Sequence, residues 1–173
     1  TIGIIMLPLV GGLIVLILPD LPRLRLRETT CVTVAAITAW FAARLAIAAG
    51  ARPITIGLAD VLHKLRLVDA GGELLSLGLP GVEGVRSIPL GFYVDHLAAL
   101  TVLASASIAA LVVIYACAGM KQGLRRGEFF AFALWALSAV NLAVLSDNTF
   151  MMFMGWSLSS VLCFHLVTLG GDR

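Results

Sequence analysis

The chain has 173 residues, of which 60% are hydrophobic and 13% charged, and its mean hydropathy is +1.03. About a quarter of the residues of a soluble domain are charged, so this composition excludes an ordinary soluble domain and predicts an integral membrane protein. The net charge of +2 is small and the basic residues are scattered, which excludes a nucleic-acid-binding surface.

Five apolar stretches are long enough to cross a bilayer, since about 20 helical residues span about 30 Å of hydrocarbon. They cover residues 2–18, 30–49, 94–118, 129–145 and 150–169. The first stretch has neither a basic leading region nor a small-residue cleavage site, and is therefore expected to be a retained helix and not a signal peptide. The predicted fold is an all-α membrane protein, with residues 1–173 forming a single membrane domain of five transmembrane helices.

Basic residues in two short loops predict the orientation of this bundle. They are Arg23, Arg25 and Arg27 before the second helix, and Lys121, Arg125 and Arg126 after the third. Both loops fall on the same side of the membrane, which the positive-inside rule assigns to the cytoplasm. The chain is therefore expected in the cytoplasmic (inner) membrane, with its N-terminus outside and its C-terminus inside.

The long segment between the second and third helices, residues 51–92, has the mixed polar and apolar composition of a soluble segment. Apolar residues at helical spacing in GLADVLHKLRLVDAGG predict a short amphipathic helix on the membrane surface. The stretches at 73–81 and 85–95 mix apolar residues with Gly and Pro, and predict two edge-like strands of a hairpin. His63 and Lys64 are expected on the solvated face of the helix and not in a site.

Motifs for catalysis and cofactor binding are missing from the sequence. Cys31, Cys117 and Cys163 are odd in number, lie in or beside apolar runs and lack metal-ligand spacing, which indicates buried thiols. There is no phosphate-binding glycine loop and no Ser, His and acid set that could be placed together. We therefore expect no active site, no metal, no cofactor and no small-molecule substrate of this chain's own.

Polar residues within the predicted helices are the candidates for a proton path, because polar groups at bilayer depth often mark ion pathways. They are Asn141, Ser157 and His165, with Ser159 and Ser160 nearby. The plainer interpretation is that the amide and hydroxyls make interhelical hydrogen bonds. His165 is a proton-relay candidate because its pKa is ordinarily near neutrality, or else a packing histidine near the cytoplasmic end.

Three further residues are assigned structural roles near helix ends. Asp95 precedes the third helix and Asp147 precedes the fifth, where a carboxylate can cap or complement the positive helix N-terminus. Trp156 is the third residue that is assigned a structural role. His96 also lies at a helix end near the interface.

Four motifs carry a resemblance to a known family. In order they are YVDHLAALTVL, VIYACAGM, EFFAFALWALSAVNLAVLSDN after a basic turn, and TFMMFMGWS. Together they resemble the N-terminal part of the antiporter-like subunits of respiratory complex I, most of all the chain-five type, from about Phe92 to Leu169. The same family includes subunits of Mrp cation/proton antiporters, of membrane-bound hydrogenases and of inorganic-carbon accumulation complexes.

The resemblance also shows two departures. Family members typically place a glutamate after the Gly-Trp pair of helix five, thought to work with a lysine on a broken helix seven, but this chain has Ser157 there. A serine hydroxyl cannot hold a negative charge at neutral pH. The family has about fourteen helices in two inverted repeats, so a chain ending at Arg173 implies a split subunit, a reduced paralogue or part of a longer protein.

The resemblance implies a membrane-arm subunit of a complex I-like proton-translocating redox or hydrogenase assembly, mainly structural because the acid and the lysine are missing. The alternative is the membrane partner of an inorganic-carbon accumulation complex, or part of a split cation/proton antiporter. A stand-alone small membrane protein is the third interpretation. The implied partners are the lipid bilayer and other membrane subunits of a hetero-oligomeric complex.

Overall fold

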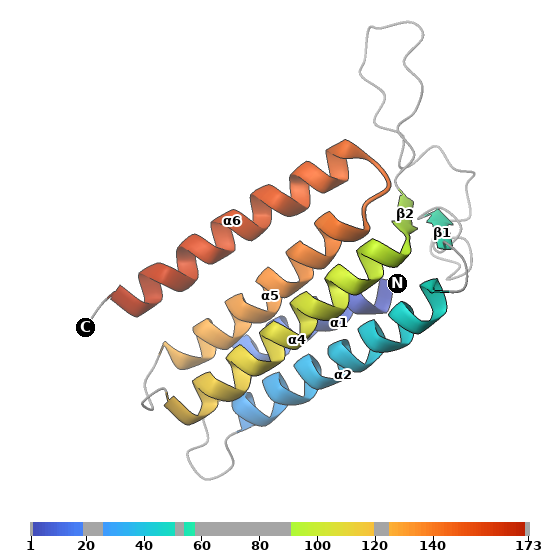
Figure 1. The fold of residues 1–173 in the computed structure, drawn as a ribbon. Coiled ribbons are helices and arrows are strands. Elements are labelled where there is room, and N and C mark those ends of the chain that lie inside the picture. Colours follow the sequence, from blue (N-terminus) through green and yellow to red (C-terminus); the bar gives the residue numbers. More distant parts are fainter. Residues whose placement is uncertain (1, 19–25, 51–53, 58–90, 120–124, 172–173) are drawn as a thin grey trace, which may run out of the picture.

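The computed structural model describes residues 2–18, 26–50, 54–57, 91–119 and 125–171, which form five helices and two short strands (Figure 1). Their bounds are α1 (Ile2–Ile17), α2 (Leu26–Ala49), β1 (Ile54–Gly57), β2 (Gly91–Val94), α4 (His96–Gly119), α5 (Arg126–Leu145) and α6 (Thr149–Gly171).

Four of these helices, α2, α4, α5 and α6, are long and apolar enough to cross a membrane. With four such helices in the described part, the chain is a multi-pass membrane protein. The remaining helix, α1, is apolar but has 16 residues, so a fifth crossing stays a prediction. The single-domain assignment and the orientation of the termini stay predictions as well.

The helices differ from the predicted ranges mainly at two N-termini. α2 begins at Leu26 instead of Thr30, and α5 at Arg126 instead of Phe129. The charges at these positions predict loops. In the structure these residues form the first helical turns, because Glu28 and Arg126 pair with each other across the two helices.

At the centre of the bundle lies α5, which packs on α1, α4 and α6 (Figure 1). Helix α2 packs on α4 and on α1. The remaining helix, α6, packs mainly on α5 and lies at the edge of the bundle. Most of the α6 surface is therefore exposed in this chain.

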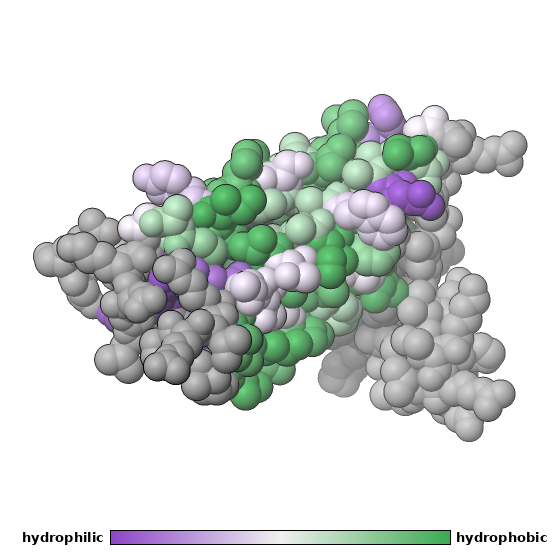
Figure 2. All heavy atoms as spheres, turned by 90° about the horizontal axis from the view of Figure 1, so that it is seen from below, coloured by the Kyte–Doolittle hydropathy of each residue, from purple (hydrophilic) through white to green (hydrophobic). Residues whose placement is uncertain are grey.

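Hydrophobic residues cover the middle of the molecular face in Figure 2, with the most hydrophilic residues toward its two ends. A bilayer would solvate such a surface. Inside the bundle there are two buried apolar clusters, one toward the strands around Val94 and Val102 and one toward the opposite end around Val15 and Phe130. We call these two ends of the bundle the strand end and the opposite end.

Glycines set how closely the helices approach, because lipid tails supply no hydrophobic drive for helix association and van der Waals packing decides it. A Cβ atom on Gly155 of α6 would lie 2.7 Å from the backbone nitrogen of Ala143 and 2.9 Å from the carbonyl oxygen of Ala139, both in α5. A Cβ on Gly12 of α1 would lie 2.5 Å from the Trp135 ring of α5. Both helices therefore pack directly against α5 at a glycine.

The strands pair antiparallel, with Ile54 opposite Val94 and Gly57 opposite Gly91. β2 falls within the second predicted strand, but its partner in the described part is β1, which the sequence analysis had not assigned. Phe92 also bridges to Ser146, and the Asp147 N–H donates to the Gly91 carbonyl at 3.0 Å. β2 thus fixes the turn between α5 and α6. The predicted surface helix, His63 and Lys64, and the predicted strand at 73–81 lie outside the described residues.

Candidate functional site

Two of the buried polar side chains, Ser138 and Asn141, lie on the side of α5 that faces α1, and a proline in α1 explains why. Pro8 lies within α1 and has no N–H, so the Ile4 carbonyl four residues earlier lacks its helical donor. The Asn141 side-chain amide donates to that carbonyl oxygen at 3.3 Å. The Ser138 hydroxyl donates to the next carbonyl, that of Ile5, at 2.7 Å. Side chains of α5 thus satisfy the backbone of α1 where the proline interrupts it.

The same set of contacts reaches α4 and continues along α1. The Ser105 hydroxyl of α4 lies 2.9 Å from the Val102 carbonyl oxygen and 3.2 Å from Asn141 Oδ1, either of which can accept its single hydrogen. Farther along α1, the Trp135 indole N–H donates to the Leu9 carbonyl at 3.0 Å. We call Ser105, Trp135, Ser138 and Asn141 the polar seam. It joins three helices through groups that carry no charge.

Asn141 is fully buried at the centre of this seam. Its carbonyl side faces Ser105 and its amide side faces Ile4, so both ends of the side chain have partners on neighbouring helices. A buried amide without such partners would cost about 1–3 kcal/mol. An amide passes hydrogen bonds but does not titrate near neutrality, so a part for Asn141 in a proton path stays a prediction.

Ser157 is half-buried on α6, two residues after the close contact at Gly155. The antiparallel packing of α5 and α6 puts Ser157 at about the level of Asn141, but the Asn141 side chain faces α1 and α4. The structure therefore does not bring the two residues together. Among the described residues, the Ser157 hydroxyl has no hydrogen-bond partner.

The other polar groups of the first half of α6 turn back on their own helix. The Ser159 and Ser160 hydroxyls both donate to the Trp156 carbonyl, at 2.8 and 3.0 Å. The Trp156 side chain itself is 69% exposed, in the second turn of α6. This part of α6 therefore offers an aromatic ring and small residues to whatever surrounds it.

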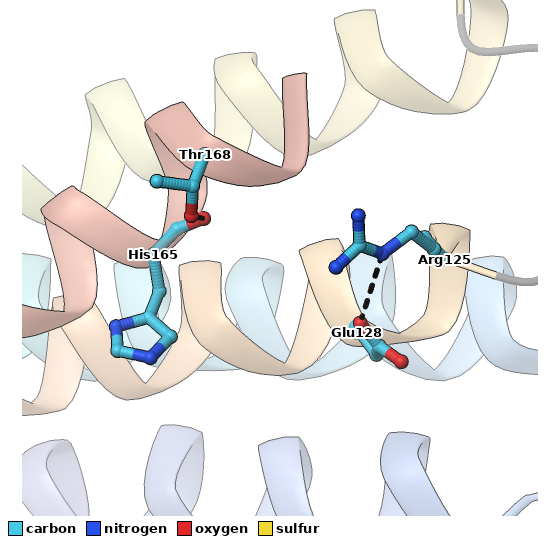
Figure 3. Close-up of polar contacts among 4 residues, drawn as sticks. All are labelled: Arg125, Glu128, His165 and Thr168. Atoms are coloured by element: carbon cyan, nitrogen blue, oxygen red, sulfur yellow. Dashed lines mark hydrogen bonds and ion pairs between the residues drawn. The ribbon is translucent and has the colours of Figure 1, made fainter. Parts of the chain in front are cut away.

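His165 lies near the end of α6 and points toward α5, as Figure 3 shows. Its ring centre is 5.4 Å from that of Phe132 in α5. His165 Nδ1 is 2.9 Å from the Val161 carbonyl oxygen, which can only accept, so Nδ1 carries the ring N–H. In this tautomer Nε2 carries no hydrogen and can accept a hydrogen bond. Eight residues, or about 12 Å of helix rise, separate His165 from Ser157.

At the strand end, one predicted acid caps its helix and the other does not. Asp95 Oδ1 accepts the Ala98 N–H at 2.6 Å, which is an N-terminal cap for α4. The cap of α6 comes from Asn148, whose Oδ1 accepts the Met151 N–H at 2.8 Å. The side-chain cap thus comes from Asn148, which directly precedes Thr149, and the predicted role of Asp147 in complementing the positive helix N-terminus stays a prediction.

A buried ion pair at the opposite end of the bundle was missed by the sequence analysis. Arg126 Nη1 lies 3.0 Å from Glu28 Oε1, with side chains 9% and 13% exposed. Arg126 Nη2 also donates to the Cys117 carbonyl at 2.7 Å, and Arg27 Nε donates to the Leu18 carbonyl at 2.6 Å. We call Arg27, Glu28 and Arg126 the end cluster. It joins the ends of α1, α2, α4 and α5.

One feature of the sequence indicates the end cluster, although the positive-inside rule, which counts only basic residues, does not use it. Glu28 is an acid directly before an apolar run, in a loop whose other charges near it are arginines on the predicted cytoplasmic side. Such an acid is well placed to pair with a basic residue of the other loop on that side. Exposed pairs are different: Arg125 Nε and Glu128 Oε2 are 3.7 Å apart with both side chains about half exposed (Figure 3).

Together these contacts limit the chemistry of the described part. No group of three or more His, Cys, Asp or Glu residues there could hold a metal ion. The buried charges belong to the end cluster, whereas the polar seam at mid-bundle consists of an amide, two hydroxyls and an indole. Such groups hold helices together and pass hydrogen bonds, but they do not store charge.

No protein-family model matches the chain. It is similar to the Na(+)/H(+) antiporter subunit A1 of Staphylococcus aureus, from strains including JH9, Newman and USA300, with 31% identity over 81 residues. The aligned part is 47% of this chain and 10% of each relative. The match therefore spans about a tenth of the length of these curated relatives.

Proposed function

We propose that the chain is a membrane subunit of an antiporter-like, proton-translocating complex, in which it holds and seals neighbouring membrane helices. The observation that carries this proposal is the similarity to Na(+)/H(+) antiporter subunit A1, a protein whose name places it in a multisubunit antiporter. The four membrane-length helices agree with that role.

A mainly structural part is supported by the groups at mid-bundle. The polar seam is uncharged, and each of its side chains has a hydrogen-bond partner on α1 or another helix. Ser157, which stands where the family resemblance implies a glutamate, supplies a hydroxyl. Charge transfer through this chain would therefore need ionisable groups from other subunits, with His165 Nε2 the group on α6 best placed to exchange a proton with them.

The surroundings of α6 support a place among other helices. This helix packs mainly on α5, and its outer surface carries large exposed side chains, among them Phe153, Trp156 and Phe164. Small residues on the same helix, such as Ser157 and Ser160, permit close approach of another helix. We propose that neighbouring subunits of the complex cover part of this surface and lipid covers the rest.

The partners decide which complex is meant, and they can be identified by purification of the tagged chain in mild detergent followed by mass spectrometry. Other subunits of a cation/proton antiporter would support the proposal in its simplest form. Iron-sulfur, quinone-reducing or hydrogenase subunits would place the chain in a redox membrane arm instead, and a large soluble zinc protein would indicate inorganic-carbon accumulation. Migration of the chain alone would contradict a subunit role.

Transport by the isolated chain is a second test. We expect that purified chain in lipid vesicles leaves an imposed pH gradient unchanged compared with protein-free vesicles, measured with a pH-sensitive dye inside the vesicles. Dissipation of the gradient by the chain alone would contradict the structural role. A vesicle sample with a known proton ionophore shows that the dye responds.

A further inference from the structure

We propose that Cys31 and Cys117 are a reactive pair that forms an intramolecular disulfide between α2 and α4 when a small, membrane-permeable disulfide reagent is present. This inference rests on the packing of α2 against α4 and does not depend on the proposed function. In the structure the three cysteines of the chain are all thiols.

The antiparallel packing of α2 and α4 brings the two cysteines to the same level. At the strand end, a Cβ on Gly50 would lie 3.9 Å from the His96 ring, which aligns the end of α2 with the start of α4. Cys31 lies 19 residues before Gly50, and Cys117 lies 21 residues after His96. At about 1.5 Å per helical residue, the two levels differ by about 3 Å.

Side-chain packing then places both cysteines in one cluster. Cys31 is a buried member of the apolar cluster at the opposite end of the bundle, and Cys117 packs against this cluster. The Cys31 thiol lies 4.0 Å from the Phe130 carbonyl oxygen of α5, and the Cys117 carbonyl accepts from Nη2 of the Arg126 side chain, so both cysteines lie at the end of the bundle where α5 begins.

Small residues at the interface let the two helices come close. The buried residues of α2 and α4 are mainly alanines: Ala35, Ala42 and Ala49 on α2, and Ala99, Ala106 and Ala116 on α4. Alanines allow close backbone approach. A disulfide needs Cα atoms about 4.4–6.8 Å apart, a separation that only a closely packed helix pair can offer.

The two thiols differ in access, and this difference sets the order of the reaction. Cys31 is fully buried, whereas Cys117 is partly exposed. The Cys117 thiolate attacks one sulfur of the reagent, breaks the reagent's S–S bond and expels one thiol. The Cys31 sulfur then gives up its proton, attacks the Cys117 sulfur of the mixed disulfide and expels the second thiol. The protein loses two hydrogens, and the reagent's disulfide is reduced to two thiols.

The experiment treats the full chain in mild detergent with dithiodipyridine, whose thiol product absorbs light, and then measures intact mass and disulfide-linked peptides. The Cys163→Ser variant is used because Cys163 is exposed and would react separately. We expect a loss of two hydrogens, two equivalents of released product and a peptide linking Cys31 to Cys117. With Cys31→Ser added, the reaction should stop at a mixed disulfide on Cys117 with one equivalent released.

Each other outcome would overturn the proposal. These are a stable mixed disulfide on Cys117 although Cys31 is present, no reaction of the folded chain, or a link between two copies of the chain. A denatured sample of the same Cys163→Ser protein should expose two reactive thiols, which shows that the reagent is active. The helical circular dichroism of each variant, compared with that of the wild type, shows that the variants fold.

Discussion

The polar seam and the polar residues of α6 use the same kinds of side chain in different ways. In the seam, Ser138 and Asn141 donate across to α1 and repair the break that Pro8 makes. On α6, Ser159 and Ser160 bond within their own helix, and the Ser157 hydroxyl has no partner in the described part of the chain. The polar groups of the seam therefore serve the packing of this chain, whereas on α6 the Ser157 hydroxyl remains available to a neighbour.

The largest effect on stability is expected from the end cluster, where a buried ion pair can be compared with an exposed one. We expect Arg126→Met to lower the free energy of unfolding by about 3–5 kcal/mol, because it removes one partner of a buried ion pair. Chemical unfolding in mild detergent, followed by circular dichroism, measures the change. Arg125→Met is the matched control, since the exposed Arg125–Glu128 pair should be worth about 0–1 kcal/mol. Equal costs for the two variants would refute the assignment.

The glycine contact of α6 is the next test. Gly155→Ala should lower the free energy of unfolding by about 1–3 kcal/mol, because the new methyl group meets the α5 backbone, which cannot rotate away. The same unfolding assay applies. Gly3→Ala is the control, as nothing lies within 4 Å of its added Cβ. A Gly155→Ala variant as stable as Gly3→Ala would mean that α6 does not pack on α5 in this way.

The link between Pro8 and Asn141 can be tested with a double-mutant cycle. Asn141→Leu should cost about 1–2 kcal/mol, because it leaves the Ile4 carbonyl without a donor in the bundle interior. In a Pro8→Ala background the backbone N–H at position 8 can supply that hydrogen bond. The cost of Asn141→Leu should therefore be smaller there. Equal costs in the two backgrounds would show that Asn141 does not compensate for the proline.

The smallest effects are expected from single serines, and they sharpen the comparison. Ser138→Ala removes a buried hydrogen bond to Ile5 and should cost about 1 kcal/mol. Ser157→Ala should change the stability of the isolated chain by less than about 0.5 kcal/mol, since the hydroxyl has no partner in the described residues. Thermal unfolding of both variants decides this. A larger loss for Ser157→Ala would reveal a partner within the chain.

A glutamate at the same position tests the surroundings in the assembled complex. Ser157→Glu should alter proton coupling only if a basic residue of another subunit faces it, because a lone carboxylate in a membrane interior is costly. The readout is proton transport by the purified complex in vesicles, with Ser160→Glu on the outer surface as the control. A basic residue within contact distance of Ser157 in the complex would count against a purely structural role.

The approximate helix positions could be predicted because a run of about 20 apolar residues in a bilayer must form a helix to satisfy its backbone hydrogen bonds. The ends were harder: Arg126 and Glu28 read as loop residues because each alone is too costly to bury, and only their pairing across α2 and α5 allows it. The role of Asn141 as an interhelical partner could be proposed from its type. Its partner could not, since nothing local in the sequence indicates that α1 packs on α5.

The strand end shows a similar limit. Asp95 was correctly placed next to a helix N-terminus, but choosing between Asp147 and Asn148 as the cap of α6 required the helix start to within one residue. β1 could not be foreseen, because four residues at 54–57 become a strand only through pairing with β2, which lies more than 30 residues away.

The attachment of β2 to the α5–α6 turn is made by main-chain atoms, the Asp147 N–H and the Gly91 carbonyl. Every amino acid except proline supplies that N–H. This contact therefore does not depend on which side chain stands at position 147, although the cap of α6 does depend on the Asn148 side chain. The surface of this helix is thus able to diversify toward new neighbours while its direction is preserved.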